Sequence, residues 1–517
     1  MLRVAKTENG KVQGLPGSDP RITSFKGIPF AAPPVGENRW RAPQPCENWE
    51  GIRQAFDFGP IAIQDTPGLG TDIYCREWHV DPDIPMSEDC LYLNVWTPAH
   101  NANEKLPVLF WIYGGAFQWG YASEMELDGE RLARRGVVVV SCTYRLGALG
   151  YLAHPELTKS QPDAPTNFGS LDQQAALKWT VRNIAAFGGD PDNISIGGQS
   201  AGGASAMLQM TCEDNYADIK SGMIISGIIR MPYFYDEFFI PGKLSRAEQN
   251  GAEFLDFCGV SGIEEARKLD AIYIRDMYAK YRENHLFMSP CIDGKFCVDE
   301  PLNRLANNQC ADIPLIVGNT TDEFISAIEA SNEEEYERCV KENFGNRASE
   351  FMEIAQGMYD PQLGYAPVSA LEPAIRAMIY NREKAGNKKP IYYYCFDADI
   401  PGEDNPGTFH SVDLWFFFET LAKCSRPYSG HHYELAATMC DYWCNFIKTG
   451  DPNGRSTMKG ELPKWEPHTE ENPMIMKFEK DIIACKLDKS ESLVEFLVDN
   501  TMNNFKKGGE KYEKAGI

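Results

Sequence analysis

Several stretches of the chain are continuously apolar and stop at glycine or small polar residues. The clearest are residues 106–113, which end in Gly114-Gly115, and residues 136–143, which contain four consecutive valines. Short apolar runs without alternation are typical of strands buried on both faces, as in a sheet covered by helices. Further strands are predicted at residues 87–98, 194–198, 314–318 and 391–396.

Between these strands lie stretches that predict helices. They cover residues 170–187, 201–210, 411–422 and 433–449, and residues 333–386 predict further helices rich in Glu and Arg. Ser170 and Gln173 have the spacing of a capping box, and Gly188-Gly189 would end that helix. Strands that alternate with helices imply an α/β fold with a largely parallel sheet and right-handed crossovers.

Other regions depart from this alternation. Residues 24–36 are rich in proline and glycine, which predicts a rigid, irregular loop. Residues 230–310 hold an aromatic cluster at 232–239 and helix patterns at 245–257 and 262–285. They predict a helical insertion over the sheet, whose aromatic side chains form either a pocket wall or the insertion's own core. Because no repeat or linker is visible, residues 1–517 are interpreted as one domain ending in a terminal helix and polar tail at 486–517.

The composition limits the partners of the chain. Its 517 residues carry a net charge of −24, which would repel a nucleic acid. No apolar run approaches the roughly 18 residues of a membrane span, and the first ten residues lack the apolar core of a secretory signal. We therefore expect a cytoplasmic protein without a membrane span; a secreted mature form and the oligomeric state stay open.

Nothing in the sequence predicts a metal site or a cofactor. The 15 cysteines are scattered without a metal-ligand pattern, and Cys440 and Cys444 have no second pair at zinc spacing. With no visible signal peptide, reduced thiols are the favoured interpretation. The neighbours His431 and His432 are expected to diverge and to form a surface pair rather than two metal ligands.

Residues 194–203 predict the chemistry. A short buried strand is followed by two glycines, then by Ser200, and then by the small-residue start of a helix. Gly198-Gln199-Ser200-Ala201-Gly202 fits the G-x-S-x-G nucleophile elbow, a tight turn in which flanking side chains would collide. The following helix N-terminus favours negative charge on a substrate oxygen. The alternative is a glycine-rich turn with an idle serine.

A serine nucleophile needs a base, and the base needs an orienting acid. Of the histidines after Ser200, His410 lies in a predicted strand-to-helix loop, where functional residues gather, whereas His468 is expected at the surface. Glu323 follows the strand at 314–318, and its neighbour Asp322 is the rival for the same role. Oxyanion donors are expected from the amide of Ala201 and from Gly114-Gly115-Ala116.

Two long motifs carry a family resemblance. Residues 88–98 and 187–202 resemble the two signatures of the type B carboxylesterases, the cholinesterase-like branch of the α/β-hydrolases. Further similarity lies at residues 25–31, 144–147, 171–179 and 445–453. The resemblance implies an α/β-hydrolase fold, with a central, mostly parallel mixed sheet flanked by helices and helical insertions over the active site.

The resemblance also implies roles for individual residues. Ser200 would be the nucleophile, His410 the base and Glu323 the acid, the choice of acid now resting on the family's usual glutamate. Oxyanion donors would be Gly115, Ala116 and Ala201, and Ser226 would support the acid.

Departures from the cholinesterase pattern limit the substrate. Gln199 stands where cholinesterases have an acid, and Trp78 is out of register with the tryptophan of their choline site. In extracellular relatives, the cysteine that corresponds to Cys90 forms a disulfide bond. Here Cys75 could reach Cys90, but reduced thiols are favoured. The resulting hypothesis is a serine carboxylic-ester hydrolase without cofactor or metal, acting on small to medium, partly apolar esters without preference for choline esters. The alternatives are a catalytically inactive adhesion-type member and a peptidase or amidase of the same fold.

Overall fold

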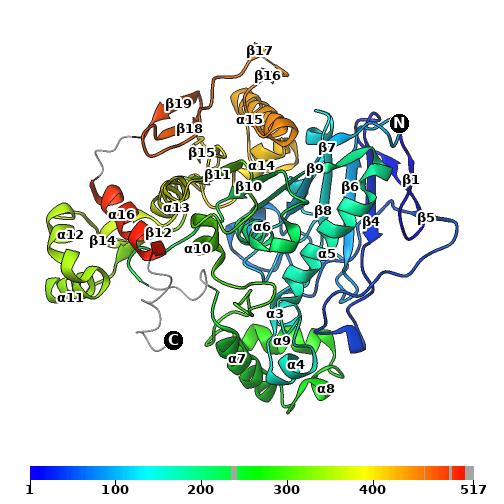
Figure 1. The fold of residues 1–517 in the computed structure, drawn as a ribbon, viewed down its shortest axis with the longest axis horizontal. Helices are drawn as coiled ribbons and strands as arrows, with labels where there is room; N and C mark the ends of the chain where they lie inside the picture. Colours follow the sequence, from blue (N-terminus) through cyan, green and yellow to red (C-terminus); the bar gives the residue numbers. More distant parts are fainter. Residues whose placement is uncertain (235–240, 459, 488–491, 507–517) are drawn as a thin grey trace.

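A mixed sheet of eleven strands runs through the molecule (Figure 1). The computed structural model describes residues 1–234, 241–458, 460–487 and 492–506. In spatial order, the sheet contains β19 (Ile482–Lys486), β18 (Met474–Phe478), β15 (Ile391–Phe396), β11 (Leu315–Thr320), β10 (Ser221–Ile225), β9 (Gly189–Gln199), β7 (Leu106–Ile112), β8 (Val138–Cys142), β6 (Tyr92–Thr97), β4 (Thr23–Pro29) and β3 (Leu15–Pro16).

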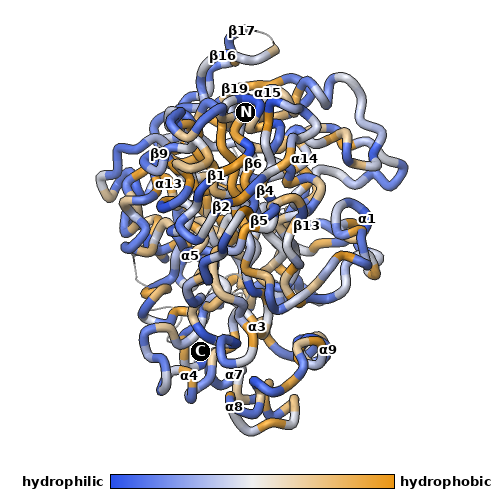
Figure 2. The backbone as a smooth tube through the Cα atoms, turned by 90° about the vertical axis from the view of Figure 1, so that its right-hand side faces the viewer, coloured by the Kyte–Doolittle hydropathy of each residue, from blue (hydrophilic) through white to orange (hydrophobic). Residues whose placement is uncertain are grey.

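The middle of this sheet is parallel and its two edges are antiparallel. Every neighbouring pair from β18 to β8 is parallel, whereas β19 and the run β6-β4-β3 pair antiparallel. All five residues of β8 are buried, as its run of valines predicted. Figure 2 shows the hydrophobic segments gathered around the strands in the middle of the molecule. The predicted, mostly parallel α/β architecture is confirmed.

Helices flank the sheet and fix the positions of the loops at its ends (Figure 1). The helices α5 (Phe168–Asn183), α6 (Ala201–Thr211) and α15 (Gly430–Thr449) all contact β7 and β9. Other helices are α1 (Ile73–Glu77), α2 (Glu130–Ala133), α10 (Pro301–Ala306), α13 (Glu372–Lys384), α14 (Leu414–Phe417) and α16 (Ser492–Lys506). Two small sheets are formed by β1 (Val4–Lys6), β2 (Lys11–Gln13) and β5 (Ile52–Gln54), and by β16 (Arg455–Ser456) and β17 (Gly460–Glu461).

The capping box predicted at Ser170 and Gln173 is wrong. The helix begins at Phe168, and both side chains are buried inside it. The Gln173 amide donates a hydrogen bond to the hydroxyl of Ser205 at 3.0 Å, so α5 uses it to contact α6 rather than to cap itself. Residues Ile184–Phe187 continue as a 3-10 helix, and Gly188 follows with φ 80°.

The loop predicted at residues 24–36 is wrong in its first half. Thr23–Pro29 is the strand β4, which pairs with β6. The pairing register shifts between Phe25 and Ile28, where Gly27 has φ +68° and donates its N–H to the side chain of Asn94. Glycine thus permits a bulge within this strand. The local content of glycine and proline had predicted a loop for the same residues.

Several predicted helices have different bounds. Residues 333–386 hold α11 (Glu333–Phe344), α12 (Ala348–Ile354) and α13, but also the strands β13 (Tyr359–Asp360) and β14 (Gly364–Ser369). These two form a third small sheet with β12 (Ile325–Ile328). The helix predicted at 411–422 is reduced to the single turn α14 and a 3-10 turn at Leu421–Lys423. Of the terminal helix predicted at 486–517, Lys486 belongs to β19, and α16 begins at Ser492. Residues 488–491 and 507–517 lie outside the described residues.

Helices do fill much of the predicted insertion at 230–310. They are α7 (Leu244–Phe257), α8 (Ile263–Ala266) and α9 (Ala271–Tyr281), which lie with α3 (Gly147–Tyr151) and α4 (Pro155–Ser160) at one end of the molecule (Figure 1). The helix predicted at 262–285 is thus two, because Asp270 caps a new start at α9. Of the aromatic cluster at 232–239, residues 235–239 lie outside the described residues, and Tyr233 is buried against Phe344 and Phe351. The extents of the domain and of the insertion stay predictions.

Among the residues that the structure describes, no helix is both long enough and apolar enough to cross a membrane.

Candidate active site

Ser200 lies at the turn between β9 and α6, in a backbone conformation that side chains rarely adopt. Its φ and ψ are 57° and −128°. A Cβ atom on Gly198 would lie 2.2 Å from the carbonyl oxygen of Gly202, and one on Gly202 would lie 2.1 Å from that of Ile112. Both glycines are therefore required by close backbone contact, and the turn is strained as the sequence motif predicted.

Glu323 and His410 are brought together from loops that follow β11 and β15. The carboxylate oxygen Oε2 of Glu323 contacts Nδ1 of the imidazole. The other ring nitrogen of His410, Nε2, lies 3.4 Å from the side-chain amide nitrogen of Gln199, the residue before Ser200. The described contacts include no hydrogen bond between Ser200 and His410, but both side chains line one cavity. Such hydrogen bonds are often long before substrate binds.

The carboxylate of Glu323 is buried and accepts two further hydrogen bonds. The hydroxyl of Ser226 donates to Oε1 at 2.6 Å, and the backbone N–H of Thr320 donates to the same atom at 2.7 Å. Asp322 instead accepts hydrogen bonds from Thr408, two residues before His410. Of the two acids that the residues alone left open, Glu323 is thus the one that contacts the imidazole.

Gly115 and Ala116 form a tight turn beyond the end of β7. Their φ angles are 105° and 56°, and a Cβ atom on Gly115 would lie 2.2 Å from the carbonyl oxygen of Trp119. In the described structure, neither backbone N–H has a hydrogen-bond acceptor. Ala201 is the first residue of α6, where the N–H has no intrahelical partner. All three residues line the same cavity as Ser200.

The cavity has a volume of about 520 Å³ and a largely aromatic and aliphatic wall. Pro241, Pro290 and Leu302 line it, so the region predicted as an insertion does supply one wall. Trp78 also lines the cavity, although its position in the sequence does not align with the tryptophan of the cholinesterase choline site. This volume and lining are typical of a site for a small organic molecule.

The chain matches the model of the carboxylesterase family over residues 2–496. This chain belongs to that family. It is 30% identical to the para-nitrobenzyl esterase of Bacillus subtilis, over 95% of this chain and 97% of that protein. It is also 30% identical to the fumonisin B1 esterase of Sphingopyxis macrogoltabida, over 92% of this chain and 86% of that protein.

Solved structures agree with the sequence comparisons. The structure of a PNB esterase superimposes with a TM-score of 0.76 and 28% identity, covering 96% of this chain and 100% of that one. The protein is a carboxylic-ester hydrolase with the α/β-hydrolase fold.

Asp413 is a buried acid of this carboxylesterase that the sequence did not reveal. It lies three residues after His410, and its Oδ2 accepts a hydrogen bond from the hydroxyl of Tyr394 at 2.8 Å. Its Oδ1 is buried without a partner in the described structure. Burial, and next the charge of Glu323, raise the pKa of Asp413 to about 7. Its position after His410 is the one sequence signal that could have identified it.

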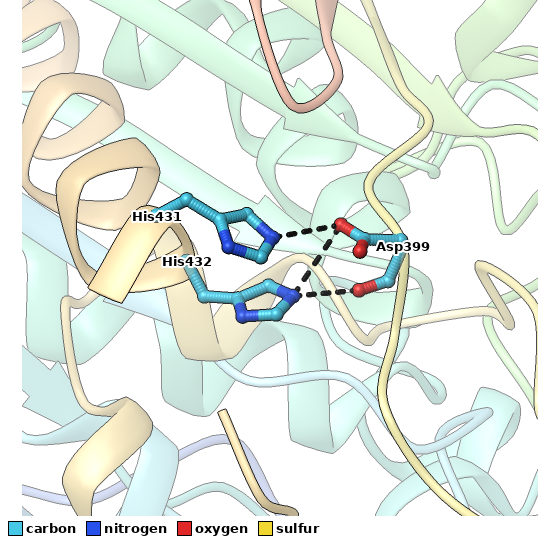
Figure 3. Close-up of side chains that lie close together, drawn as sticks. All are labelled: Asp399, His431 and His432. Atoms are coloured by element: carbon cyan, nitrogen blue, oxygen red, sulfur yellow. Dashed lines mark hydrogen bonds and ion pairs between the residues drawn. The ribbon is translucent and has the colours of Figure 1, made fainter. Parts of the chain in front are cut away.

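His431 and His432 were predicted to diverge at the surface, but their rings lie side by side and His432 is buried. Both Nε2 atoms face Asp399, at 3.1 and 3.4 Å from Oδ1, and the ring centroids are 3.8 Å apart (Figure 3). In His432, Nδ1 accepts the backbone N–H of Ser429, so the proton lies on Nε2, which donates to the backbone oxygen of Asp399 at 2.7 Å. A metal ion would need a lone pair on that Nε2. These contacts therefore favour a hydrogen-bonded helix cap for α15.

Two other expectations meet the structure differently. His468 is not at the surface: it is 1% exposed, and it contacts the carbonyl oxygen of Met474 and the hydroxyl of Tyr380. Satisfied hydrogen bonds let a polar ring remain inside. Cys75 and Cys90 are both free thiols, as favoured from the sequence, and so are the other cysteines.

Proposed function

We propose that this carboxylesterase cleaves its substrates by a serine mechanism. Ser200 attacks the ester carbonyl while Nε2 of His410 takes the hydroxyl proton. The tetrahedral intermediate collapses, and the alcohol leaves with that proton. Water, activated by His410, then attacks the acyl-enzyme, and the acid is released as Ser200 regains its proton.

One observation carries this proposal: the buried carboxylate of Glu323 contacts Nδ1 of His410 in the cavity wall that holds Ser200. A proton held on Nδ1 leaves the lone pair on Nε2, as a general base requires. The charge of Glu323 also stabilises the imidazolium ion that forms during attack. Ser226 and Thr320 keep that carboxylate in place through their hydrogen bonds.

The backbone supplies the stabilisation of the oxyanion. Within the described part of the chain, the N–H groups of Gly115 and Ala116 have no other acceptor, and that of Ala201 begins α6, where the helix dipole favours negative charge. The carboxylate and the three amides need neither metal nor cofactor. The volume and apolar wall of the cavity favour small to medium, partly apolar esters.

A fluorophosphonate probe tests the mechanism. The unmodified protein should be labelled at Ser200 and should hydrolyse p-nitrophenyl butyrate. Ser200→Ala should abolish labelling and lower kcat by about 10⁴-fold or more, with an unchanged circular dichroism spectrum. Absence of labelling in the unmodified protein would support an inactive member of the fold, and near-normal turnover by the variant would exclude Ser200 as nucleophile.

Matched ester and amide substrates address the peptidase alternative. We expect much faster cleavage of p-nitrophenyl butyrate than of the corresponding p-nitroanilide. A series of p-nitrophenyl esters from acetate to palmitate then measures the acyl pocket, with the best kcat/KM expected at short to medium chains. An optimum at palmitate would contradict the proposed substrate size.

A further inference from the structure

The cavity that holds Ser200 has an acidic wall. Among the described residues, four carboxylic acids line it and no lysine or arginine does. Two of the acids are neutralised, since Asp65 pairs with Arg282 and Glu300 pairs with Arg230. A ligand that carries a negative charge would therefore be repelled, and a ligand that carries a positive charge would find two carboxylates without a lysine or arginine partner among the described residues, those of Asp72 and Glu124.

Glu124 is the lining acid whose charge is least compensated. Its Oε1 accepts the backbone N–H of Tyr121 at 3.0 Å and lies 2.8 Å from Nε2 of His79. Burial lowers the pKa of His79, which disfavours the charged form of this imidazole. In the described structure, no lysine or arginine contacts Glu124, although its side chain is only 6% exposed.

A second acid, Glu126, lies behind Glu124 and interacts with it. Glu126 is fully buried, and neither of its carboxyl oxygens has a hydrogen-bond partner in the described structure. Burial, followed by the nearby charge of Glu124, raises the pKa of Glu126. Burial likewise raises the pKa of Glu124. Two adjacent buried carboxyl groups cannot both ionise at low cost, so Glu126 keeps its proton and the negative charge of the pair rests on Glu124, which a bound cation would stabilise.

Trp78, one of the aromatic residues that line this cavity, offers little to a cation. Trp78 is 4% exposed, and its ring is stacked on Phe409 at 6.2 Å with an interplanar angle of 19°. Tyr74 and Trp415 pack against the same indole ring. Because other rings cover Trp78, a cation–π contact between this indole and a ligand is restricted, whereas the carboxylate of Glu124 lines the cavity.

We propose that Glu124, with Glu126 behind it, binds a protonated amine on the substrate, so that the favoured esters carry an ammonium group with at least one N–H. This inference deepens the proposed function and rests on it. An N–H donor can make a charge-assisted hydrogen bond to the carboxylate, whereas the methyl groups of a quaternary ammonium keep its charge at a distance. A neutral ester of the same shape leaves the carboxylate unpaired.

Two matched ester pairs test the proposal. In each pair, a cationic ester is compared with the neutral ester in which carbon replaces nitrogen: 2-(dimethylamino)ethyl butyrate with 3-methylbutyl butyrate, and butyrylcholine with 3,3-dimethylbutyl butyrate. In mildly alkaline buffer at about 0.15 M salt, where long-range charge is screened, kcat/KM should favour the protonated amine by about tenfold or more. The quaternary ester should gain less than about tenfold over its own isostere.

Variants assign the preference to its source. Glu124→Gln keeps the shape and a hydrogen-bond acceptor but removes the charge, so the amine-to-isostere ratio should fall by about tenfold. Asp72→Asn is the matched control, because Asp72 lines the same cavity without a lysine or arginine partner but caps α1 through the N–H of Cys75. Removal of that charge should leave most of the ratio intact. Circular dichroism and melting temperature confirm that each variant is folded.

The outcomes separate this inference from the proposed function. Turnover of both neutral esters with an amine ratio near one in the unmodified protein overturns the amine site alone. An equal preference for butyrylcholine, or a preference that survives Glu124→Gln, shows that another group reads the cation. If the unmodified protein cleaves none of the esters, the proposed function fails as well. Should Glu124→Gln not fold, the amine ratio of the unmodified protein is measured from about pH 8 down to about pH 6. It should fall as Glu124, whose pKa burial raises to about 7, gains a proton, and a constant ratio would overturn the amine site.

Discussion

Asp322 accepts two hydrogen bonds from Thr408, one from its backbone N–H at 2.8 Å and one from its hydroxyl at 3.0 Å. The next acid in the chain, Glu323, contacts His410, the second residue after Thr408. Two consecutive acids after β11 therefore contact the same loop. Asp322 holds it at Thr408, and Glu323 contacts the imidazole of His410. Asp322, a rival for the catalytic acid on sequence grounds, thus holds the loop that carries His410, and we expect it to position that imidazole.

Asp322→Ala should reduce kcat by about tenfold or more with little change in KM, because small displacements of a catalytic group are costly. Asp322→Asn retains an acceptor for Thr408 and should recover part of the loss. The control is Asp163→Ala, since that side chain is 93% exposed and far along the chain from the site. Steady-state kinetics with p-nitrophenyl butyrate decide; an equal loss in the Asn and Ala variants, or a change confined to KM, would contradict positioning.

Ser226→Ala should lower kcat by about tenfold, because the ionised carboxylate of Glu323 loses a donor at 2.6 Å. A buried serine away from Glu323 provides the matched control. Ser195 bonds the hydroxyl of Ser221 at 2.6 Å, so Ser195→Ala removes a similar contact and should leave kcat near normal. If both variants lose the same activity, the effect of Ser226→Ala reflects general destabilisation.

Asp413 should make the protein less stable as pH rises from about 4 to about 7. The folded state raises the pKa of Asp413 from 3.8 to about 7, so in this interval it keeps a proton that the unfolded chain has released. Stability therefore falls with pH across the interval, by up to a few kcal/mol on an order-of-magnitude estimate, and levels off above it. Asp413→Asn cannot ionise and should show a flatter dependence.

Melting temperatures measured across this pH range compare Asp413→Asn with the unmodified protein. Because the substitution also changes a buried contact with Tyr394, the slope with pH is the readout rather than the absolute value. Asp163→Asn, at an exposed position, should keep the original slope. A slope that Asp413→Asn leaves unchanged would assign the pH dependence to other groups.

Gly202→Ala should prevent a stable fold or lower the melting temperature strongly, because the added Cβ would lie 2.1 Å from the carbonyl oxygen of Ile112. Backbone cannot yield as a flexible side chain can. Gly430→Ala is the control: nothing lies within 4 Å of its Cβ position, at the first turn of α15. That change should be neutral or slightly stabilising. A folded Gly202→Ala variant with normal melting would show that the elbow can relax.

Local patterns were sufficient for much of the sheet. The strands β7, β8, β11 and β15 lie where continuous apolar runs placed them, because a strand buried on both faces needs apolar residues at consecutive positions. The turn at Ser200 was equally predictable from the sequence. Its glycines are required because a Cβ atom there would collide with residues nearby in the chain and with the adjacent strand. Even the long helix α15 was found, apart from its first turn.

Features that depend on partners far along the chain were missed. Thr23–Pro29 is a strand only because β6 pairs with it, and Gln173 serves an interhelical contact rather than a cap. His468 is buried because Tyr380 and Met474 satisfy its ring nitrogens. The local sequence does not show which distant residues a side chain or strand will contact. Local composition and spacing therefore predicted a loop, a helix cap and a surface side chain.

The candidate site divides in the same way. By itself, the sequence determined that Ser200 stands in a strained turn at a helix start, because that turn is made by neighbouring residues. The residues by themselves left Glu323 and Asp322 open, and the family resemblance favoured Glu323; the tertiary structure decided that Glu323 contacts His410, and that Glu124 and Trp78 share the cavity with Ser200. These residues lie in loops at the ends of different strands, and their distances are set by the packing of the whole sheet rather than by the local chain.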